Sequence, residues 1–328
     1  MNTSENSDRQ ASQTSDLTCI GGAAINRKYH AKAALITATS NPATGHITFG
    51  GVARNVAETL ARLEANVMLV SLVGDDEAGR AILHHLSGLG IDISQTVVSP
   101  TSTTAEYIAI LDKANELHIG MAAMDAFEAI TPVVLESAWP HFQASGWMFA
   151  DCNLPEATLR DLLHRKAETS AKLAINTVSV PKAARLPQKL SAIDVLFTNA
   201  DEARAMLGDT TETPEHLTEK LRTRGARGVV LTLGAKGHLV ADETSITHIS
   251  SLDATPLDVT GAGDALMSGT LYGLMTGQSL VDASRLGVVL ATFTLESEQD
   301  VLPNLSPAWL EAQTDRLARI TSRKLPAS

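Results

Sequence analysis

Short apolar segments that alternate with helical stretches constrain the fold of this chain more than any other feature of its sequence. Between these segments, apolar residues recur every three or four positions, as on one face of a helix. Repeated strand-helix alternation predicts an α/β fold with a mainly parallel sheet and helices on both faces. The expected strands are 17–25 (running into a glycine turn), 67–73, 147–151, 172–176, 195–199 and 228–233; the expected helices include 52–63, 79–89 and 266–275.

The alternation is interrupted between residues 101 and 125. Segments 103–111 and 117–121 have the pattern of two strands joined by a polar turn. A hairpin inserted among α/β units is typical of a lid over a ligand site. We expect lid segments at about 27–48 and 101–125 within one domain that spans 17–328, although the region from 26 to 42 shows no clear periodicity of its own. Residues 1–16 are polar, and we expect a disordered lead-in there.

Composition excludes several classes of function. The formal net charge of -11 argues against nucleic-acid binding, which depends on clustered Lys and Arg. The only cysteines, Cys19 and Cys152, form no CxxC pair, so neither a disulfide scaffold nor a cysteine zinc site is expected, and a reducing cytoplasm fits. No stretch approaches the ~20 apolar residues of a membrane span. We therefore expect a cytoplasmic protein with small-molecule partners, no nucleic acid and no membrane.

The strongest local signal is the stretch Thr260-Gly-Ala-Gly-Asp264, which opens an apolar helix. Small residues at a helix start leave its first N–H groups unobstructed, which suits an oxyanion or a phosphoryl group. A carboxylate there can accept the proton of an attacking hydroxyl. The tetrapeptide 261–264 within it is also explained as a glycine turn with an acid that stabilises the helix dipole. The tetrapeptide alone does not decide between these readings.

A second motif supports the chemical reading. Residues 49–57, with the sequence FGGVARNVA, lie about two hundred positions before the first motif. Together the two resemble the signatures of the ribokinase-like (PfkB) carbohydrate and nucleoside kinases. The resemblance implies a three-layer sandwich with a mainly parallel central sheet and a small β lid. Within the family, stretches 40–42, 49–57, 150–153 and 258–264 are most similar to the kinases that phosphorylate the 5′-hydroxyl of pseudouridine.

The resemblance also implies roles for matching positions. Asp264 would be the catalytic base, beside an anion hole formed by the amides of Gly261, Ala262 and Gly263. Gly50, Gly51 and Asn55 would contact the sugar, because glycines permit close backbone approach and an amide both donates and accepts. The lid hairpin would supply contacts to the nucleobase of the substrate, with Tyr107 and residues 121–125 as weak candidates. For each of these residues, packing between lid and core is the stronger explanation.

The nucleotide side would use ATP with Mg²⁺. Asn199 and Glu202 resemble the NxxE element that holds Mg²⁺ through water, although an Asn with a Glu three residues later is also a capping box. Thr232 and Gly234 resemble the turn near the ATP phosphates or ribose. Asp258 and Thr260 match positions where many relatives bind a monovalent cation, so K⁺ dependence is a hypothesis.

One position departs from the family pattern. Asn26 stands where relatives usually have an Asp that accepts bonds from sugar hydroxyls. A charge-assisted bond would be lost, so we expect Asn26→Asp to lower the apparent KM. Ribokinase, adenosine kinase or fructokinase activity are alternatives to pseudouridine phosphorylation, and a weakly catalytic sugar- or nucleoside-binding sensor is an alternative of another class. Relatives often form homodimers through their lids, so a dimer is expected on the same ground.

Overall fold

Side chains along the strands of the central sheet alternate between two apolar cores. Trp147 and Phe149 enter one core, whereas Met148 and Ala150 enter the other. The same alternation recurs at Val195, Leu196 and Phe197. A strand whose two faces are both apolar must be covered on both sides, which requires two helical layers.

The computed structural model describes residues 15–114, 116–209 and 211–326. Within this part of the chain, nine strands form the central sheet in the order β15-β14-β13-β12-β11-β10-β9-β1-β4. The run from β4 to β12 is parallel, and the last three strands are antiparallel. Their bounds are β1 Leu17–Ile20, β4 Val67–Val70, β9 Trp147–Asp151, β10 Lys172–Asn176, β11 Val195–Asn199, β12 Gly228–Thr232, β13 His238–Ala241, β14 Ile246–Ile249 and β15 Ser322–Lys324.

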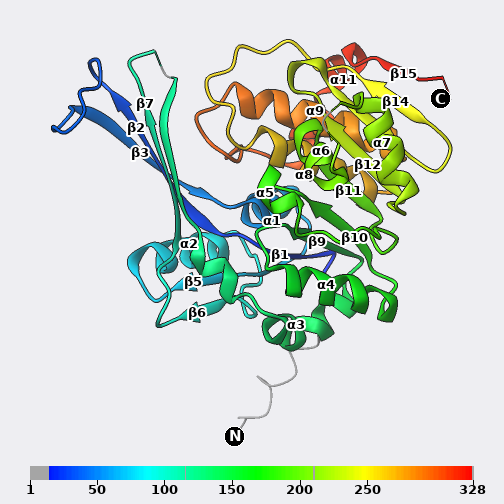
Figure 1. The fold of residues 1–328 in the computed structure, drawn as a ribbon, viewed down its shortest axis with the longest axis horizontal. Helices are drawn as coiled ribbons and strands as arrows, with labels where there is room; N and C mark the ends of the chain where they lie inside the picture. Colours follow the sequence, from blue (N-terminus) through cyan, green and yellow to red (C-terminus); the bar gives the residue numbers. More distant parts are fainter. Residues whose placement is uncertain (1–14, 115, 210, 327–328) are drawn as a thin grey trace, which may run out of the picture.

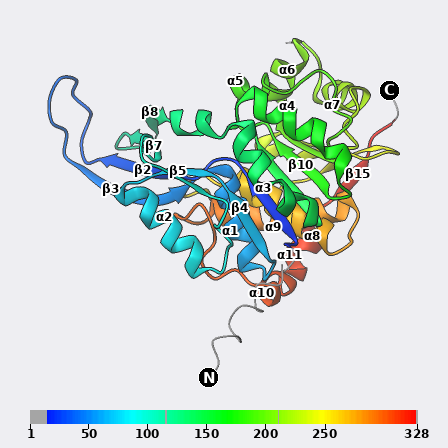
Figure 2. The same cartoon turned by 90° about the horizontal axis from the view of Figure 1, so that it is seen from below.

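Helices cover both faces of this sheet (Figure 2). One layer contributes to the core that contains Phe142 and consists of α3 Pro132–Ala144, α4 Glu156–Arg165, α5 Val180–Ala183, α6 Ala200–Leu207 and α7 Pro214–Thr223. The other contributes to the core that contains Leu60 and includes α1 Val52–Arg62, α2 Glu77–Gly88, α8 Ala262–Met275, α9 Leu280–Leu295 and α10 Pro307–Glu311, with α11 Thr314–Arg319 beside it. No helix in the described ranges has the length and apolarity needed to cross a membrane.

A second sheet projects from the body and forms the lid (Figure 1). Among the described residues it has four strands in the order β3-β2-β7-β8: β2 Ala24–Ala31, β3 Ala43–Gly50, β7 Ala105–Leu111 and β8 Leu117–Ala123. Strand β5 Leu72–Gly74 pairs with β6 Val97–Ser99 near its base. The lid strands β2 and β3 lie between β1 and α1 in the chain, so the lid is connected directly to the body at both of its ends.

The predicted three-layer α/β fold is confirmed, with differences in detail. The apolar run 67–73 is not one strand: it divides at Ser71, whose hydroxyl donates to the carbonyl of Gly21, into β4 and β5. The aperiodic region from 26 to 42 contains most of β2, whose residues are polar on both faces. Most of the expected lead-in, residues 1–14, lies outside the described residues, but Asp16 is bonded through its backbone and side chain to Asn66.

Candidate active site

The start of α8 presents open backbone amides. Gly261 caps the helix with φ of 80°, a left-handed conformation that favours glycine, and no side chain among the described residues caps the helix start. A Cβ at Gly261 would lie 2.5 Å from the carbonyl oxygen of Asp300. Gly263 is exposed and has open space where a Cβ would be. The first turn of α8 is therefore an unobstructed set of donors for an anion.

Asp264 lies in this first turn and is partly buried. Its carboxylate accepts a 2.6 Å hydrogen bond from the side-chain amide of Asn55. Burial raises the pKa of Asp264 to about 7; the Asn55 bond opposes this rise and the nearby charge of Asp300 adds to it. A carboxyl group with such a pKa is well matched to proton transfer near neutral pH.

Asn55 has one polar atom without a partner. Its Nδ2 donates to Asp264, but its Oδ1 is buried and accepts no hydrogen bond within the described part of the chain. Leaving a buried acceptor unpaired costs about 1–3 kcal/mol. An unpaired acceptor beside a basic carboxylate is well placed to receive a hydrogen bond from a hydroxyl of a ligand.

The Gly50-Gly51 turn is held by two buried charged side chains. Arg54 donates to the carbonyl oxygens of Phe49 and Gly50, and it is paired with Glu58 one turn further along α1. Asp151, at the end of β9, accepts from the backbone amides of Gly22 and Ala53 at 2.9 and 3.0 Å. These bonds hold the Gly50-Gly51 turn next to the Gly21-Gly22 turn that follows β1.

Gly51 is required for that close approach. Its φ is 95°, and a Cβ there would lie 2.4 Å from the carbonyl oxygen of Gly22. A Cβ at Gly50 would lie 2.4 Å from Oδ1 of Asn26, so the Asn26 side chain packs directly on the turn. The two segments 21–26 and 50–55 therefore form one continuous surface next to Asp264.

Asn26 has an ionic partner that its sequence context does not reveal. Its Nδ2 donates to Oδ2 of Asp300 at 2.6 Å, and both residues are buried. Thr48, paired with Asn26 across β2 and β3, lies 3.4 Å from the same oxygen. A carboxylate therefore lies beside position 26, and it comes from the loop that follows α9.

The predicted nucleotide-side residues form a second group at the ends of β11 and β12. Asn199 and Glu202 make a complete capping box at the start of α6, and Glu202 also accepts from Thr177. Thr232 pairs with Asn199 in the sheet register. Gly234 follows with φ of 61°. The capping-box alternative is therefore real: Oε2 of Glu202 accepts from Thr177 and from the Asn199 backbone amide, and Oε1 accepts from Nδ2 of Asn199, so only Oε1 keeps a lone pair that a metal-bound water could use.

The sequence and the structure agree unevenly on the lid. The register places Tyr107 beside Asn26 on one face, whereas Met121 pairs with Ile108 on the opposite face and is exposed. Met121, a weak candidate for a ligand contact, therefore lies on the lid face opposite to Asn26 and the site.

Sequence reasoning assigned no role to four residues that shape the site: Lys28, Arg54, Asp151 and Asp300. Arg54 lies inside the second motif, where a charged residue among apolar ones gives some signal. Asp151 ends a predicted strand, although its partners are distant in sequence. Lys28 and Asp300 carry no local signal, because their importance depends on contacts across more than 250 residues.

Comparison with known proteins agrees with this geometry. Residues 14–306 match the pfkB family of carbohydrate kinases. Pseudouridine kinase of Escherichia coli strain K12 is 28% identical over 293 residues, which cover 88% of this chain and 93% of that protein.

Two solved structures share the fold. A carbohydrate kinase from Agrobacterium tumefaciens superposes with a TM-score of 0.82 at 30% identity and covers 94% of this chain and 99% of its own. Arabidopsis thaliana ribokinase, solved with ribose and ATP, gives a TM-score of 0.78 at 18% identity, with 93% and 99% covered, and shows the fold alone. With the family match extending from residue 14 to 306, this chain belongs to the pfkB family of carbohydrate kinases.

Proposed function

We propose that this kinase transfers the γ-phosphoryl group of ATP to the primary 5′-hydroxyl of a nucleoside, and that pseudouridine is its acceptor. The observation that carries the proposal is the position of Asp264 at the open start of α8, bonded to Asn55. Family membership supports the kinase class, and the similarity to a pseudouridine kinase supports the acceptor.

In the proposed reaction, Asp264 accepts the proton of the acceptor hydroxyl. The hydroxyl oxygen then forms a bond to the γ-phosphorus while the bond from that phosphorus to the β,γ-bridging oxygen breaks, releasing ADP. Negative charge on the migrating phosphoryl group is stabilised by the amides of Gly261, Ala262 and Gly263. The product is a phosphate monoester, and the proton leaves from Asp264.

The acceptor would be oriented by the surface next to the base. The unpaired Oδ1 of Asn55 is suited to a sugar hydroxyl, and Gly50 and Gly51 allow its close approach. Asn26 keeps an amide oxygen and one N–H for the substrate while its other N–H is bonded to Asp300. Neutral polar groups of this kind suit the hydroxyls of a ribosyl ring.

ATP would lie toward the ends of β11 and β12, near Thr232 and Gly234. The family uses ATP, typically with a divalent metal. The donor set at Asn199 and Glu202 consists of hard oxygens already oriented by the capping box, which fits Mg²⁺ held through water. Bound there, the metal would neutralise phosphate charge.

An ADP-release assay with pseudouridine, uridine, ribose and fructose tests the proposal. We expect the highest kcat/KM with pseudouridine. Replacing the base with Asp264→Asn should lower kcat by roughly 10²–10⁴-fold with little change in KM. The control Asp253→Asn removes a fully exposed carboxylate and should not change either constant.

Each other outcome has a distinct meaning. A preference for ribose or fructose would replace pseudouridine with one of the alternative acceptors and leave the kinase intact. Equal turnover by Asp264→Asn and the parent would exclude Asp264 as the base. Tight binding of a nucleoside without ADP release would favour the sensor alternative, for which Asn26 in place of an Asp is the motivating observation.

We also propose that two copies of the chain associate through their lids. Tyr29, Ile47, Ile119 and Met121 share one face of the lid by register and are exposed by 36%, 62%, 46% and 59%. The same face carries the Arg27–Glu106 ion pair, and a sheet face that exposes several apolar side chains around such a pair is typical of a protein–protein contact. The opposite face of the lid carries Asn26 and Lys28 and is turned toward the body.

A further inference from the structure

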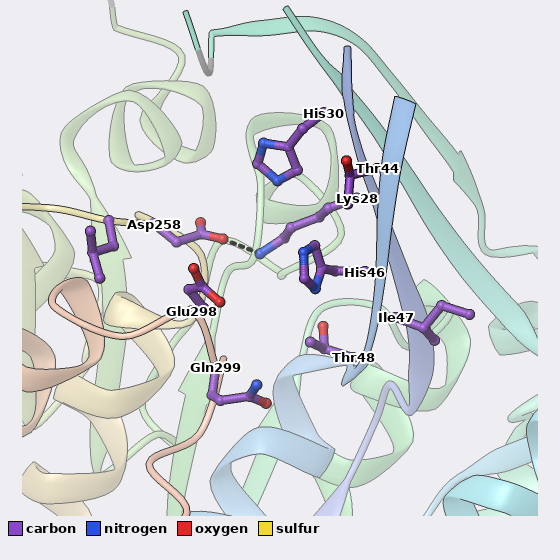
Figure 3. A pocket seen from close by; sticks show the side chains of 10 residues that line it. Lys28, His30, Thr44, His46, Ile47, Thr48, Asp258, Glu298 and Gln299 are labelled. Carbon is purple, nitrogen blue, oxygen red and sulfur yellow. Dashed lines mark hydrogen bonds and ion pairs between the residues drawn. The ribbon is translucent and has the colours of Figure 1, made fainter. Parts of the chain in front are cut away.

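Lys28 reaches from the lid into the loops that frame the anion hole. Its ammonium group is bonded to Oδ2 of Asp258 and lies 3.4 Å from Oδ1 of Asp300. The side chains of Lys28 and Asp300 are only 9% and 3% exposed. Figure 3 shows Lys28 extending from β2 toward Asp258, at a cavity of about 310 Å³ between the lid and the body.

Both carboxylates lie next to the start of α8 in space. Asp258 accepts a 2.8 Å bond from the amide of Thr260, directly before Gly261. The carbonyl oxygen of Asp300 packs against Gly261. The positive charge of Lys28 therefore holds two segments in place, the one around Asp258 and the one around Asp300, and both contact the residues of the proposed anion hole.

This donor set does not fit a bound monovalent cation at Asp258. One oxygen of Asp258 receives the Lys28 ammonium and the other receives the Thr260 amide. A second cation placed here would face a buried ammonium of the same sign.

We propose that the Lys28 ammonium replaces the monovalent cation at Asp258, so that phosphoryl transfer by this chain does not depend on K⁺. The proposal rests on the kinase function proposed above. A lysine ammonium is a compact point charge with three donors, so it can hold two carboxylates as a small cation does. Unlike a free cation, the Lys28 ammonium is covalently attached to β2, so its position depends on the position of the lid.

The parent protein gives the first test. ADP release is measured with Mg²⁺-ATP in K⁺, Na⁺ or tetramethylammonium chloride at equal ionic strength. We expect kcat and KM to differ by less than about twofold among the three salts. Stimulation by K⁺ of more than about fivefold would overturn the proposal, whatever the variants do.

The second test is Lys28→Met, which keeps an unbranched side chain without the charge. We expect kcat in tetramethylammonium to fall about tenfold or more, with partial recovery in K⁺ or ammonium. Loss of activity in all salts by a folded variant still supports the need for a tethered charge. Full activity of Lys28→Met in tetramethylammonium contradicts the proposal. The control Lys220→Met removes a surface lysine paired with Asp209 and Glu212 and should behave as the parent.

Melting temperature provides a readout that needs no acceptor. K⁺ should raise the melting temperature of Lys28→Met more than that of the parent or of Lys220→Met, because Lys28→Met leaves the buried Asp300 beside Asp258 without their shared cation, whereas the two carboxylates freed by Lys220→Met are partly exposed. Equal shifts in the three proteins would contradict cation replacement. If the parent releases no ADP with any acceptor, the proposed function fails, and this melting comparison still decides the role of Lys28. If Lys28→Met does not fold, the salt response of the parent decides.

Discussion

At the scale of single residues, the properties of the site come from the neighbours of Asp264. Asn55 donates to its carboxylate, and Asp300 and Asp151 add negative charge nearby. Burial and like charges favour the protonated form, whereas the Asn55 bond favours the ionised form. The balance leaves a carboxyl group that exchanges its proton near neutral pH rather than a permanently charged one.

This balance predicts a pH dependence. A base must be ionised to accept a proton, so activity should be lost as the pH falls through the folded pKa of Asp264, about 7. We expect kcat/KM to reach a plateau above that pH and to decrease about tenfold per pH unit below it. Steady-state kinetics across this range measures the profile, and a profile that stays flat well below pH 6 would contradict a raised pKa.

The pair Asn26 and Asp300 predicts a different effect from the one expected by family comparison. Asn26→Asp would place two carboxylates at a buried 2.6 Å contact, so the structure favours a raised KM rather than a lowered one. The exchanged variant Asn26→Asp/Asp300→Asn restores a donor and an acceptor and should recover much of the loss. Acceptor KM and the free energy of unfolding of the four proteins give the coupling, expected at about 0.5–3 kcal/mol. Additive effects of the two substitutions would contradict direct pairing.

At the scale of elements, α8 positions the amides of the proposed anion hole. It packs against α9 through glycines: a Cβ at Gly269 would lie 2.7 Å from the Cα of Gly287. Such close backbone contact fixes α8 relative to the loop after α9, which carries Asp300. The position of its first turn is therefore set by helix packing along its whole length.

Two glycines at the ends of α8 allow a matched test of this view. Gly261→Ala would meet both a left-handed φ of 80° and the Asp300 carbonyl, so we expect a loss of activity together with a loss of stability. Gly277→Ala also has a positive φ, 86°, but open space around it, so it should cost only about 1 kcal/mol and keep full activity. Urea unfolding and kcat measure both effects. Equal behaviour of the two variants would show that the contact with Asp300 has no special role.

At the scale of the whole molecule, the base of the lid joins the apolar cores through Ala24, Ile25 and Ala105, whereas next to the site the lid meets the body through polar contacts. Asn26, Lys28 and Thr48 of the lid all approach Asp300 of the body. Polar groups in such contacts can exchange their partners for water, and this property suits a lid that opens to admit substrate. The outer face of the lid is mostly apolar, with the Arg27–Glu106 ion pair among its side chains, and this asymmetry motivates the proposed dimer.

Ile119→Glu and Met121→Glu test that dimer. Each places a charge on the outer face of the lid, so we expect monomers in sedimentation velocity experiments where the parent is a dimer. Val133→Glu is the control, because Val133 on α3 is 76% exposed and lies outside the lid. A monomeric parent at micromolar concentration, or dimers of all the variants, would exclude association through this face.

The sequence by itself determined the layers and the centre of the site. Apolar runs such as Trp147–Asp151 and Val195–Asn199 must be buried on both faces, and this local pattern is enough to specify a parallel sheet between helices. The glycine motif before Asp264 likewise predicts an open helix start, because backbone freedom is a property of the residue itself. The strands and the open helix start could therefore be predicted, because both depend on residues that are adjacent in the sequence.

Only the tertiary structure decided which charges meet there. Polar β2 gave no strand signal, because its residues Asn26 and Lys28 serve the site instead of a core. Their partners Asp258 and Asp300 lie more than 200 residues away, and no local pattern encodes such a pairing. Folding brings these charges together by packing α8 and α9 against the sheet below the lid, and electrostatic interactions depend on that distance in space rather than on distance along the chain.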